Sequence, residues 1–156
     1  MEFALKFIPL AILIIPLVSF LVIIFFGKRL PRQGDWLGTG FLFLNLFLSI
    51  YVFIAFLSLG NYSITYDWFS LGINETKFTV EFVVDQLSAV MLIVVNLISA
   101  LVHLFSVKYM EGDSKYSKYF AYLGLFTFSM LGIVITNNLL LMYVFWELVG
   151  LSSYLL

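Results

Sequence analysis

The stretch that decides the fold is residues 85–107, DQLSAVMLIVVNLISALVHLFSV. Its apolar part is long enough to cross hydrocarbon about 30 Å thick, for which a helix needs roughly 20 residues. At about 100° per residue, its polar side chains fall within an arc of roughly 80°. These side chains belong to Asp85, Ser88, Asn96, Ser99, His103 and Ser106. The pattern predicts a membrane helix that turns one polar stripe to protein or water and its other faces to lipid.

The composition agrees with a membrane location. Hydrophobic residues make up 63% of the chain and charged residues 11%, whereas soluble domains carry about 25% charged residues. The mean hydropathy is +1.09. We therefore expect an integral membrane protein in contact with the lipid bilayer. The net charge of −1 gives no basic surface for nucleic acid, and we expect no nucleic-acid partner.

The chain has no cysteine and a single histidine. This composition excludes disulfides, thiolate chemistry and cysteine-ligated iron–sulfur clusters on this chain. A metal site built from several histidines is excluded as well. We expect no metal and no cofactor to be bound by this chain itself.

Four further apolar segments join the first one, and together they predict an all-α integral membrane protein of about five transmembrane helices. The expected helices lie near residues 7–26, 36–59, 87–107, 119–136 and 138–156. Asn137 and Asn138 leave little room between the last two, so we expect a tight antiparallel pair. The first helix lacks a cleavage site of the signal-peptide kind and is expected to stay as an anchor. Residues 1–156 are expected to form one membrane unit, the N-terminal part of an antiporter-like helix bundle.

The loop at residues 60–84 has a pattern of its own. Residues 64–68 and 77–82 alternate apolar and polar side chains with period two, and Gly72 and Asn74 between them are turn formers. Such a pattern predicts a β-hairpin. The alternative is an irregular loop.

The basic residues predict the orientation of the chain in the membrane. Three lysines or arginines lie in residues 27–35 and three more in residues 108–118, whereas the loop at 60–81 holds only Lys77. By the positive-inside rule the two basic loops are expected to be cytoplasmic. The N-terminus and the hairpin are then expected outside.

Each polar residue of the 85–107 stretch has a structural alternative to a functional role. Serine and asparagine commonly join membrane helices by hydrogen bonds. His103 can relay protons near neutral pH, or it can simply donate a hydrogen bond to a neighbouring carbonyl. Asp85 can be an exposed acid favoured by the helix dipole. A possible proton path would use His103, Asp85, Asn96 and Ser99.

Glu147 is the strongest candidate for function. It lies roughly 13 Å along the last helix from Asn138, near the middle of the hydrocarbon. Tyr143, Gly150 and Tyr154 share its face, which predicts a packed and partly polar interior surface with Tyr143 on the possible path. An ionisable residue inside a membrane is costly and indicates a functional site. The alternative is a protonated glutamate that donates a hydrogen bond between helices.

The residues around Glu147 resemble a known family. Residues 145–150, FWELVG, followed by SYLL at 153–156, resemble the fifth-helix signature of the largest antiporter-like subunit of respiratory complex I, called subunit L or chain 5 of NADH–quinone oxidoreductase. VDQLS at 84–88, FAYL at 120–123 and NNLL at 137–140 are also similar to this family. The resemblance covers the whole chain but only about the first quarter of a family member.

The resemblance implies a function and its partners. Glu147 matches the glutamate that pairs, in the family, with a lysine on the seventh helix; charge movement on that pair couples quinone reduction elsewhere to proton translocation. NADH, FMN, iron–sulfur clusters and quinone are expected in partner subunits. The partners are expected to be other membrane subunits of complex I, antiporter-like neighbours included, in a bacterial inner membrane. We expect the chain to be an N-terminal fragment that is inactive alone.

Two other functions stay open. The A subunit of multisubunit sodium/proton antiporters shares much of the pattern, but tends towards Thr-Ser where this chain has Val149 and Gly150. The other alternative is a structural membrane subunit in which Glu147 stays protonated.

Overall fold

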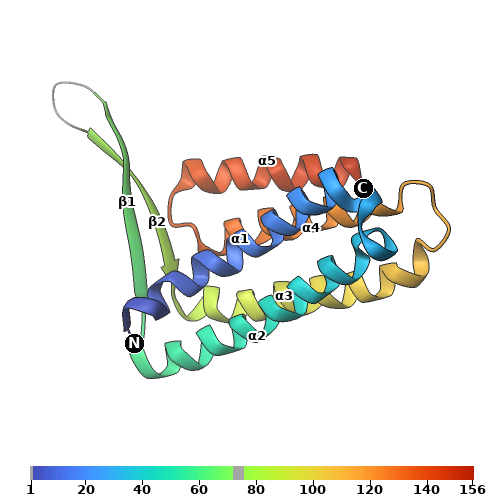
Figure 1. The fold of residues 1–156 in the computed structure, drawn as a ribbon. Helices are drawn as coiled ribbons and strands as arrows, with labels where there is room; N and C mark the ends of the chain where they lie inside the picture. Colours follow the sequence, from blue (N-terminus) through green and yellow to red (C-terminus); the bar gives the residue numbers. More distant parts are fainter. Residues whose placement is uncertain (1, 72–75) are drawn as a thin grey trace.

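The computed structural model describes residues 2–71 and 76–156, which form a helix bundle with a projecting hairpin (Figure 1). The helices are α1 (Glu2–Phe26), α2 (Asp35–Leu59), α3 (Gln86–Tyr109), α4 (Tyr116–Ile135) and α5 (Leu139–Leu155). In the described residues, four helices have the length and composition needed to cross a membrane, and α5 is a shorter apolar helix. The predicted all-α membrane fold is confirmed, and the chain is a multi-pass membrane protein.

The predicted hairpin is present and extends further than the alternating pattern indicated. Strands β1 (Tyr62–Leu71) and β2 (Thr76–Val84) pair antiparallel, with Tyr62 opposite Val84 and Leu71 opposite Thr76. The turn predicted at Gly72 and Asn74 lies outside the described residues. The hairpin is anchored to the bundle where α4 meets α5: the Asn137 backbone N–H donates to the Glu81 carbonyl at 3.0 Å. The Asn137 side-chain amide also donates to Glu81 Oε2 at 2.7 Å.

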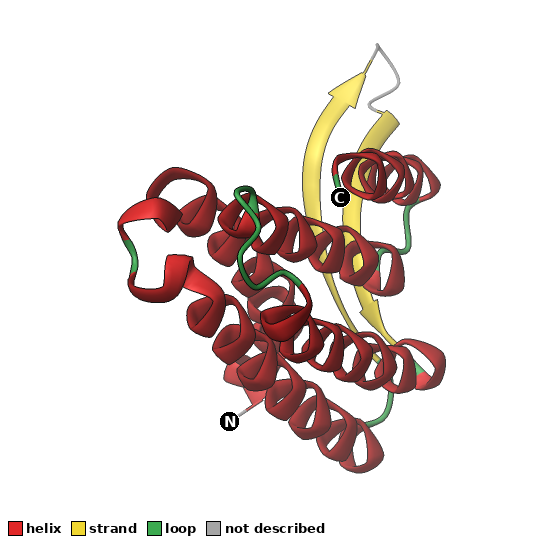
Figure 2. Cartoon of the chain, turned by 90° about the vertical axis from the view of Figure 1, so that its right-hand side faces the viewer, coloured by secondary structure: helices red, strands yellow, loops and turns green. Residues whose placement is uncertain are grey.

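The helices pack unequally. Helix α4 contacts α1, α3 and α5, and α2 contacts α1 and α3, whereas α5 has α4 as its principal neighbour. Figures 1 and 2 both place α5 at the side of the bundle away from α2. The main core includes Ile12, Val52, Leu92 and Leu131, all fully buried, and α5 contributes Phe145 to it.

A proline in α1 organises the polar part of this core. Pro16 has no N–H to donate to the carbonyl of Ile12, one helical turn earlier. The side-chain amide of Asn45 in α2 donates to that carbonyl instead, at 2.8 Å. Ser49 Oγ donates to the Asn45 carbonyl at 2.8 Å, and Asn96 Nδ2 of α3 donates to Ser49 Oγ at 2.7 Å. Buried polar groups thereby link three helices.

The contact between α4 and α5 depends on a glycine. A Cβ atom added to Gly132 would lie 2.3 Å from the ring of Phe145. The ring therefore lies directly against the α4 backbone. Its other neighbour is Phe128, whose ring centroid is 5.5 Å away in an edge-to-face arrangement. These contacts fix which side of α5 faces the bundle.

Candidate functional site

The main candidate, Glu147, lies near the middle of α5. Asn138 caps the start of this helix, where its side-chain oxygen accepts the Leu140 and Leu141 N–H groups at 2.9 and 3.4 Å. Counting at about 1.5 Å per residue places Glu147 roughly 13 Å along the helix from its cap. The cap fixes where α5 begins, and this fixes how far along the helix the Glu147 carboxylate lies.

Glu147 faces away from α4. Phe145, which is 7% exposed, packs on α4, and two residues further along a helix the direction changes by about 200°. Glu147 is exposed in the described chain. Tyr143 lies one turn earlier on the same side of α5, where residues four apart are neighbours on the helix surface. The two polar side chains therefore form one small group.

The surface around Glu147 is uncovered. We call it the Glu147 face, made of Tyr143, Glu147, Gly150 and Tyr154. Tyr143 is 61% exposed and Tyr154 is 85% exposed, and a Cβ on Gly150 would meet no atom within 4 Å. The prediction that this face is packed is wrong for the described residues. Its four residues do share one side of α5, but no described helix covers them.

The predicted polar stripe of α3 does face the interior. Ser88, Asn96, His103 and Ser106 are buried, Ser99 is half-buried and Asp85 is exposed. Ser106 Oγ lies 3.2 Å from the Tyr119 hydroxyl of α4, and Asn96 joins the network of Ser49 described above. The stripe therefore joins α3 to its neighbours.

Asp85 caps α3. Its Oδ1 accepts the Ser88 backbone N–H at 2.8 Å, while Ser88 Oγ accepts the Asp85 N–H at 2.8 Å, a reciprocal capping box. The backbone hydrogen bond from Ser88, followed by the one from its side chain, holds the pKa of Asp85 below its ordinary value. This geometry supports the structural alternative for Asp85.

His103 is fully buried with one hydrogen bond. Its Nδ1 lies 3.0 Å from the Ser99 carbonyl. Because a carbonyl can only accept, Nδ1 carries the hydrogen. The ring meets Phe120 of α4 edge-on, with centroids 5.8 Å apart, and Nε2 has no partner among the described residues. Helix α4 separates α3 from α5 in Figure 1, and no described hydrogen bond connects His103 to Glu147.

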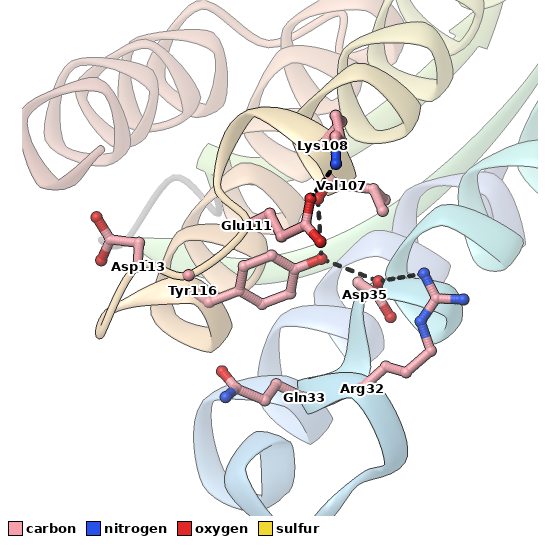
Figure 3. Close-up of a pocket in the computed structure, with 9 residues that line it drawn as sticks. Arg32, Gln33, Asp35, Val107, Lys108, Glu111, Asp113 and Tyr116 are labelled. Atoms are coloured by element: carbon pink, nitrogen blue, oxygen red, sulfur yellow. Dashed lines mark hydrogen bonds and ion pairs between the residues drawn. The ribbon is translucent and has the colours of Figure 1, made fainter.

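A buried carboxylate that the sequence analysis missed is that of Asp35, the first residue of α2 (Figure 3). Asp35 is 1% exposed. Its carboxylate accepts hydrogen bonds from Arg32 at 3.2 Å, the Trp36 N–H at 2.6 Å and the Tyr116 hydroxyl of α4 at 2.9 Å. Arg32 and Gln33 adopt left-handed φ angles of 53° and 57°, which is uncommon outside glycine. An acid beginning a helix was visible in the sequence, but its distant Tyr116 partner was not.

Across the described parts of the chain, no three acidic or histidine side chains gather as a metal site would require. The polar groups that the structure does assemble are therefore the Glu147 face, the α3 stripe with its network, and the Asp35 cluster. Only the first places an ionisable side chain in the middle of an apolar helix without burying it.

Comparison with known proteins connects these features to one family. The family described as "NADH-Ubiquinone oxidoreductase (complex I), chain 5 N-terminus" matches residues 68–120. NADH-ubiquinone oxidoreductase chain 5 of Allomyces macrogynus is 39% identical over 150 residues, which cover 94% of this chain and 23% of that protein. NADH-quinone oxidoreductase subunit L of Buchnera aphidicola is 36% identical, over 93% of this chain and 24% of its own length. The chain thus spans about a quarter of the length of these relatives.

Solved structures share the fold. A chain of the membrane-bound sulfane sulfur reductase, an archaeal respiratory membrane complex, superposes with a TM-score of 0.77 at 17% identity, over 94% of this chain and 29% of that one. A chain of the Mrp complex from Dietzia sp. gives a TM-score of 0.75 at 22% identity, over 95% of this chain and 15% of that one. At these identities the likeness concerns the fold alone.

Proposed function

Because the chain belongs to the family of complex I chain 5 and subunit L, and corresponds to the N-terminal region of that family, we propose that it takes part in proton translocation by the membrane arm of NADH:quinone oxidoreductase. Glu147 is the residue that carries the proton or the charge. The observation that supports this role is an ionisable side chain at mid-helix on an uncovered face.

The chemistry of the Glu147 face supports a second group from elsewhere. A carboxylate facing hydrocarbon is costly, so such residues face a protein interior or a water-filled cavity. The lysines and arginines of this chain lie at helix ends, in loops or in the hairpin. A cation paired with Glu147 therefore has to come from another part of the complex. In this proposal later helices of the subunit cover the Glu147 face and supply it.

Tyr143 positions the carboxylate in this proposal. Residues four apart are neighbours on a helix surface, so the Tyr143 hydroxyl can donate a hydrogen bond to the ionised form. When Glu147 takes up a proton, the same hydroxyl can accept one instead. Redox chemistry is assigned to partner subunits, and this chain contacts other membrane subunits. The basic loops are cytoplasmic in the proposed orientation.

The proposal is tested in the assembled complex with the full-length subunit. Glu147→Gln should lower proton pumping per NADH oxidised by about ten-fold or more, because a positioned proton-transfer group typically contributes at least that much. Glu147→Asp should retain much more. The matched control is Glu111→Gln, which neutralises an exposed carboxylate outside the helices. Dye-quenching measurements on vesicles, with NADH oxidation recorded in parallel, give the ratio of protons pumped to NADH oxidised.

The same measurement separates the alternatives. Full pumping by Glu147→Gln would contradict the proposal and favour a structural subunit with a permanently protonated glutamate. The sodium/proton antiporter alternative rests on the pattern that its A subunit shares with this sequence. That alternative predicts pumping driven by a sodium gradient without NADH.

His103 is proposed to hold α3 in place as a neutral ring, because its one hydrogen bond is a donation to a carbonyl and it is fully buried. His103→Gln, which can still donate to the Ser99 carbonyl, should leave the pH profile of pumping unchanged. A displaced pH profile with intact complex assembly would instead place His103 on a proton path.

A further inference from the structure

The charges at one end of the bundle do not balance. We call residues 27–35 and 108–118 the basic end; they contain six basic residues. Arg32 forms an ion pair with Asp35, and Lys108 forms one with Glu111. The remaining acid, Asp113, accepts the Lys115 backbone N–H through Oδ1 at 2.6 Å. No described acidic side chain pairs with the side chains of Lys28, Lys115 and Lys118.

These three lysines line a single cavity. It has a volume of about 390 Å³, and its other lining residues are Gln33, Ser114 and Ser117, so the lining includes no acid. Lys28 comes from the short helix that follows α1, whereas Lys115 and Lys118 flank the start of α4. Two separate segments therefore bring lysines to one space, beside the hydroxyl group of Ser114; the Ser117 hydroxyl donates to the Ile23 carbonyl at 3.5 Å. Cations gathered in this way favour an anion with several oxygen acceptors.

The beginning of α4 adds to this preference. No side chain caps the helix at Lys115. The Tyr116 N–H donates to the Asp113 carbonyl at 3.3 Å, and the positive end of the helix dipole lies beside the cavity. Phosphate is the anion that this combination of lysine, hydroxyl and helix start suits.

A second cavity continues from the first and indicates the source of the phosphate. It shares Lys115 and Lys118 with the first cavity. Its other lining residues are one acid, Asp113, and the apolar or aromatic residues Met110, Tyr119, Tyr122, Leu155 and Leu156. Tyrosines beside lysines at a helix end are typical of the level of lipid headgroups. An inorganic phosphate would use the first cavity only, whereas a phospholipid would use both.

We propose that the cavity formed by Lys28, Lys115 and Lys118 binds the headgroup phosphate of an anionic phospholipid, whose glycerol and upper acyl chain lie along Tyr119 and Tyr122. The negative charge of the headgroup phosphate partly offsets the three clustered ammonium groups. It also ties the segment after α1 to the start of α4.

The test uses the full-length subunit in its assembled complex, placed in nanodiscs of phosphatidylcholine with a titrated fraction of phosphatidylglycerol. Phosphatidylglycerol retained on the complex is counted by native mass spectrometry. Lys115→Gln and Lys118→Gln should each weaken retention about five-fold, the equivalent of about 1 kcal/mol per lysine. The double variant with arginine at both positions should retain the lipid. Arg29→Gln, which removes one charge from the basic end but does not line the cavity, is the matched control.

Each other outcome overturns the proposal. Equal retention by the lysine variants and the parent would show that the cavity does not bind the lipid. An equal loss in Arg29→Gln would show a diffuse surface attraction in place of a site. Displacement of phosphatidylglycerol by millimolar inorganic phosphate at constant ionic strength would show that the site binds free phosphate.

Discussion

Helices α3 and α5 are both apolar helices with one polar face, yet the structure treats the two faces in opposite ways. In α3 the stripe turns inward, and Asn96 and Ser106 each meet a polar group on a neighbouring helix. In α5 the Glu147 face turns away from its principal neighbour, α4. Helix α3 packs against α2, α4 and β2, so its polar groups have partners within the chain. Two buried atoms of the α3 stripe, Asn96 Oδ1 and His103 Nε2, still have no partner among the described residues. The difference is that the α3 stripe makes most of its hydrogen bonds within the described chain, whereas no described helix covers the Glu147 face.

The physical reason for the contrast is the solvent. Hydrocarbon offers no hydrogen bonds, so a polar group in a membrane helix needs a protein or water partner. The α3 side chains obtain theirs from Ser49, Tyr119 and carbonyl groups, and they stabilise the bundle. Among the described residues, Glu147 lacks such a set. For this reason the proposed function makes the Glu147 face a surface for contact with another part of the complex.

The largest expected effect comes from two glycines. Gly132 of α4 lies against the inner side of α5, and Gly150 lies on the outer side of α5 itself. Gly132→Ala should destabilise the protein by about 1–3 kcal/mol, since the added methyl group overlaps the Phe145 ring and overpacking of a core typically costs this much. Gly150→Ala meets no atom in the described chain and should even stabilise α5 by roughly 0.5–1 kcal/mol. Thermal unfolding in detergent measures both.

In the assembled complex, Gly150→Ala also tests whether another helix covers the Glu147 face. If another helix covers the Glu147 face, Gly150→Ala should reduce assembly or pumping there, because small residues permit close approach of membrane helices. Normal assembly and pumping with Gly150→Ala would mean that no helix packs closely on this face. Equal stability of Gly132→Ala and the parent would contradict the observed α4–α5 contact.

The features predicted correctly from the sequence are those with a local cause. Length and hydropathy predict membrane helices, and period two predicts the hairpin at residues 64–82. The direction of the α3 stripe follows from its 100° periodicity once the other faces are apolar. Asp85 and Ser88 stand at the spacing of a capping box, so the structural alternative for Asp85 was also within reach of the sequence.

The features that were missed depend on residues far apart in the chain. The Asp35 carboxylate is satisfied by Tyr116, and no local pattern connects the two. The left-handed φ angles of Arg32 and Gln33 are likewise set by the fold, since neither residue type favours them. The described chain leaves the Glu147 face uncovered, and the sequence did not predict this, because helical periodicity identifies which residues share a face but not what covers it.

An effect of similar size is expected from the polar network that begins at Pro16. Asn45→Leu should cost about 1–3 kcal/mol, because it leaves the buried Ile12 carbonyl without its donor. Pro16→Ala restores a backbone N–H one turn after Ile12, so in that background Asn45→Leu should cost less. The double-mutant cycle should give a coupling of about 1 kcal/mol between the two sites.

The control for this cycle is Ser58→Ala, since the Ser58 hydroxyl donates to a carbonyl of its own helix at an exposed position. Ser58→Ala should change the free energy of unfolding by the same amount in the parent and in the Pro16→Ala background. Additive effects of Pro16→Ala and Asn45→Leu would show that the amide is not replacing the missing backbone donor. The polar groups between α1 and α2 would then contribute independently.

The smallest expected effect concerns the start of α3, where Asp85 is exposed. Hydrogen bonds from Ser88 lower the pKa of the folded Asp85, so its stabilising contribution is present above its unfolded pKa and is lost as the pH falls through the folded value. Between about pH 5 and pH 2 the parent should lose up to about 1 kcal/mol, less where solvent screens the charge. Asp85→Asn caps a helix equally well without titrating. Thermal unfolding of both proteins across this range should therefore show a difference that changes with pH, and parallel curves would contradict a capping role for the ionised carboxylate.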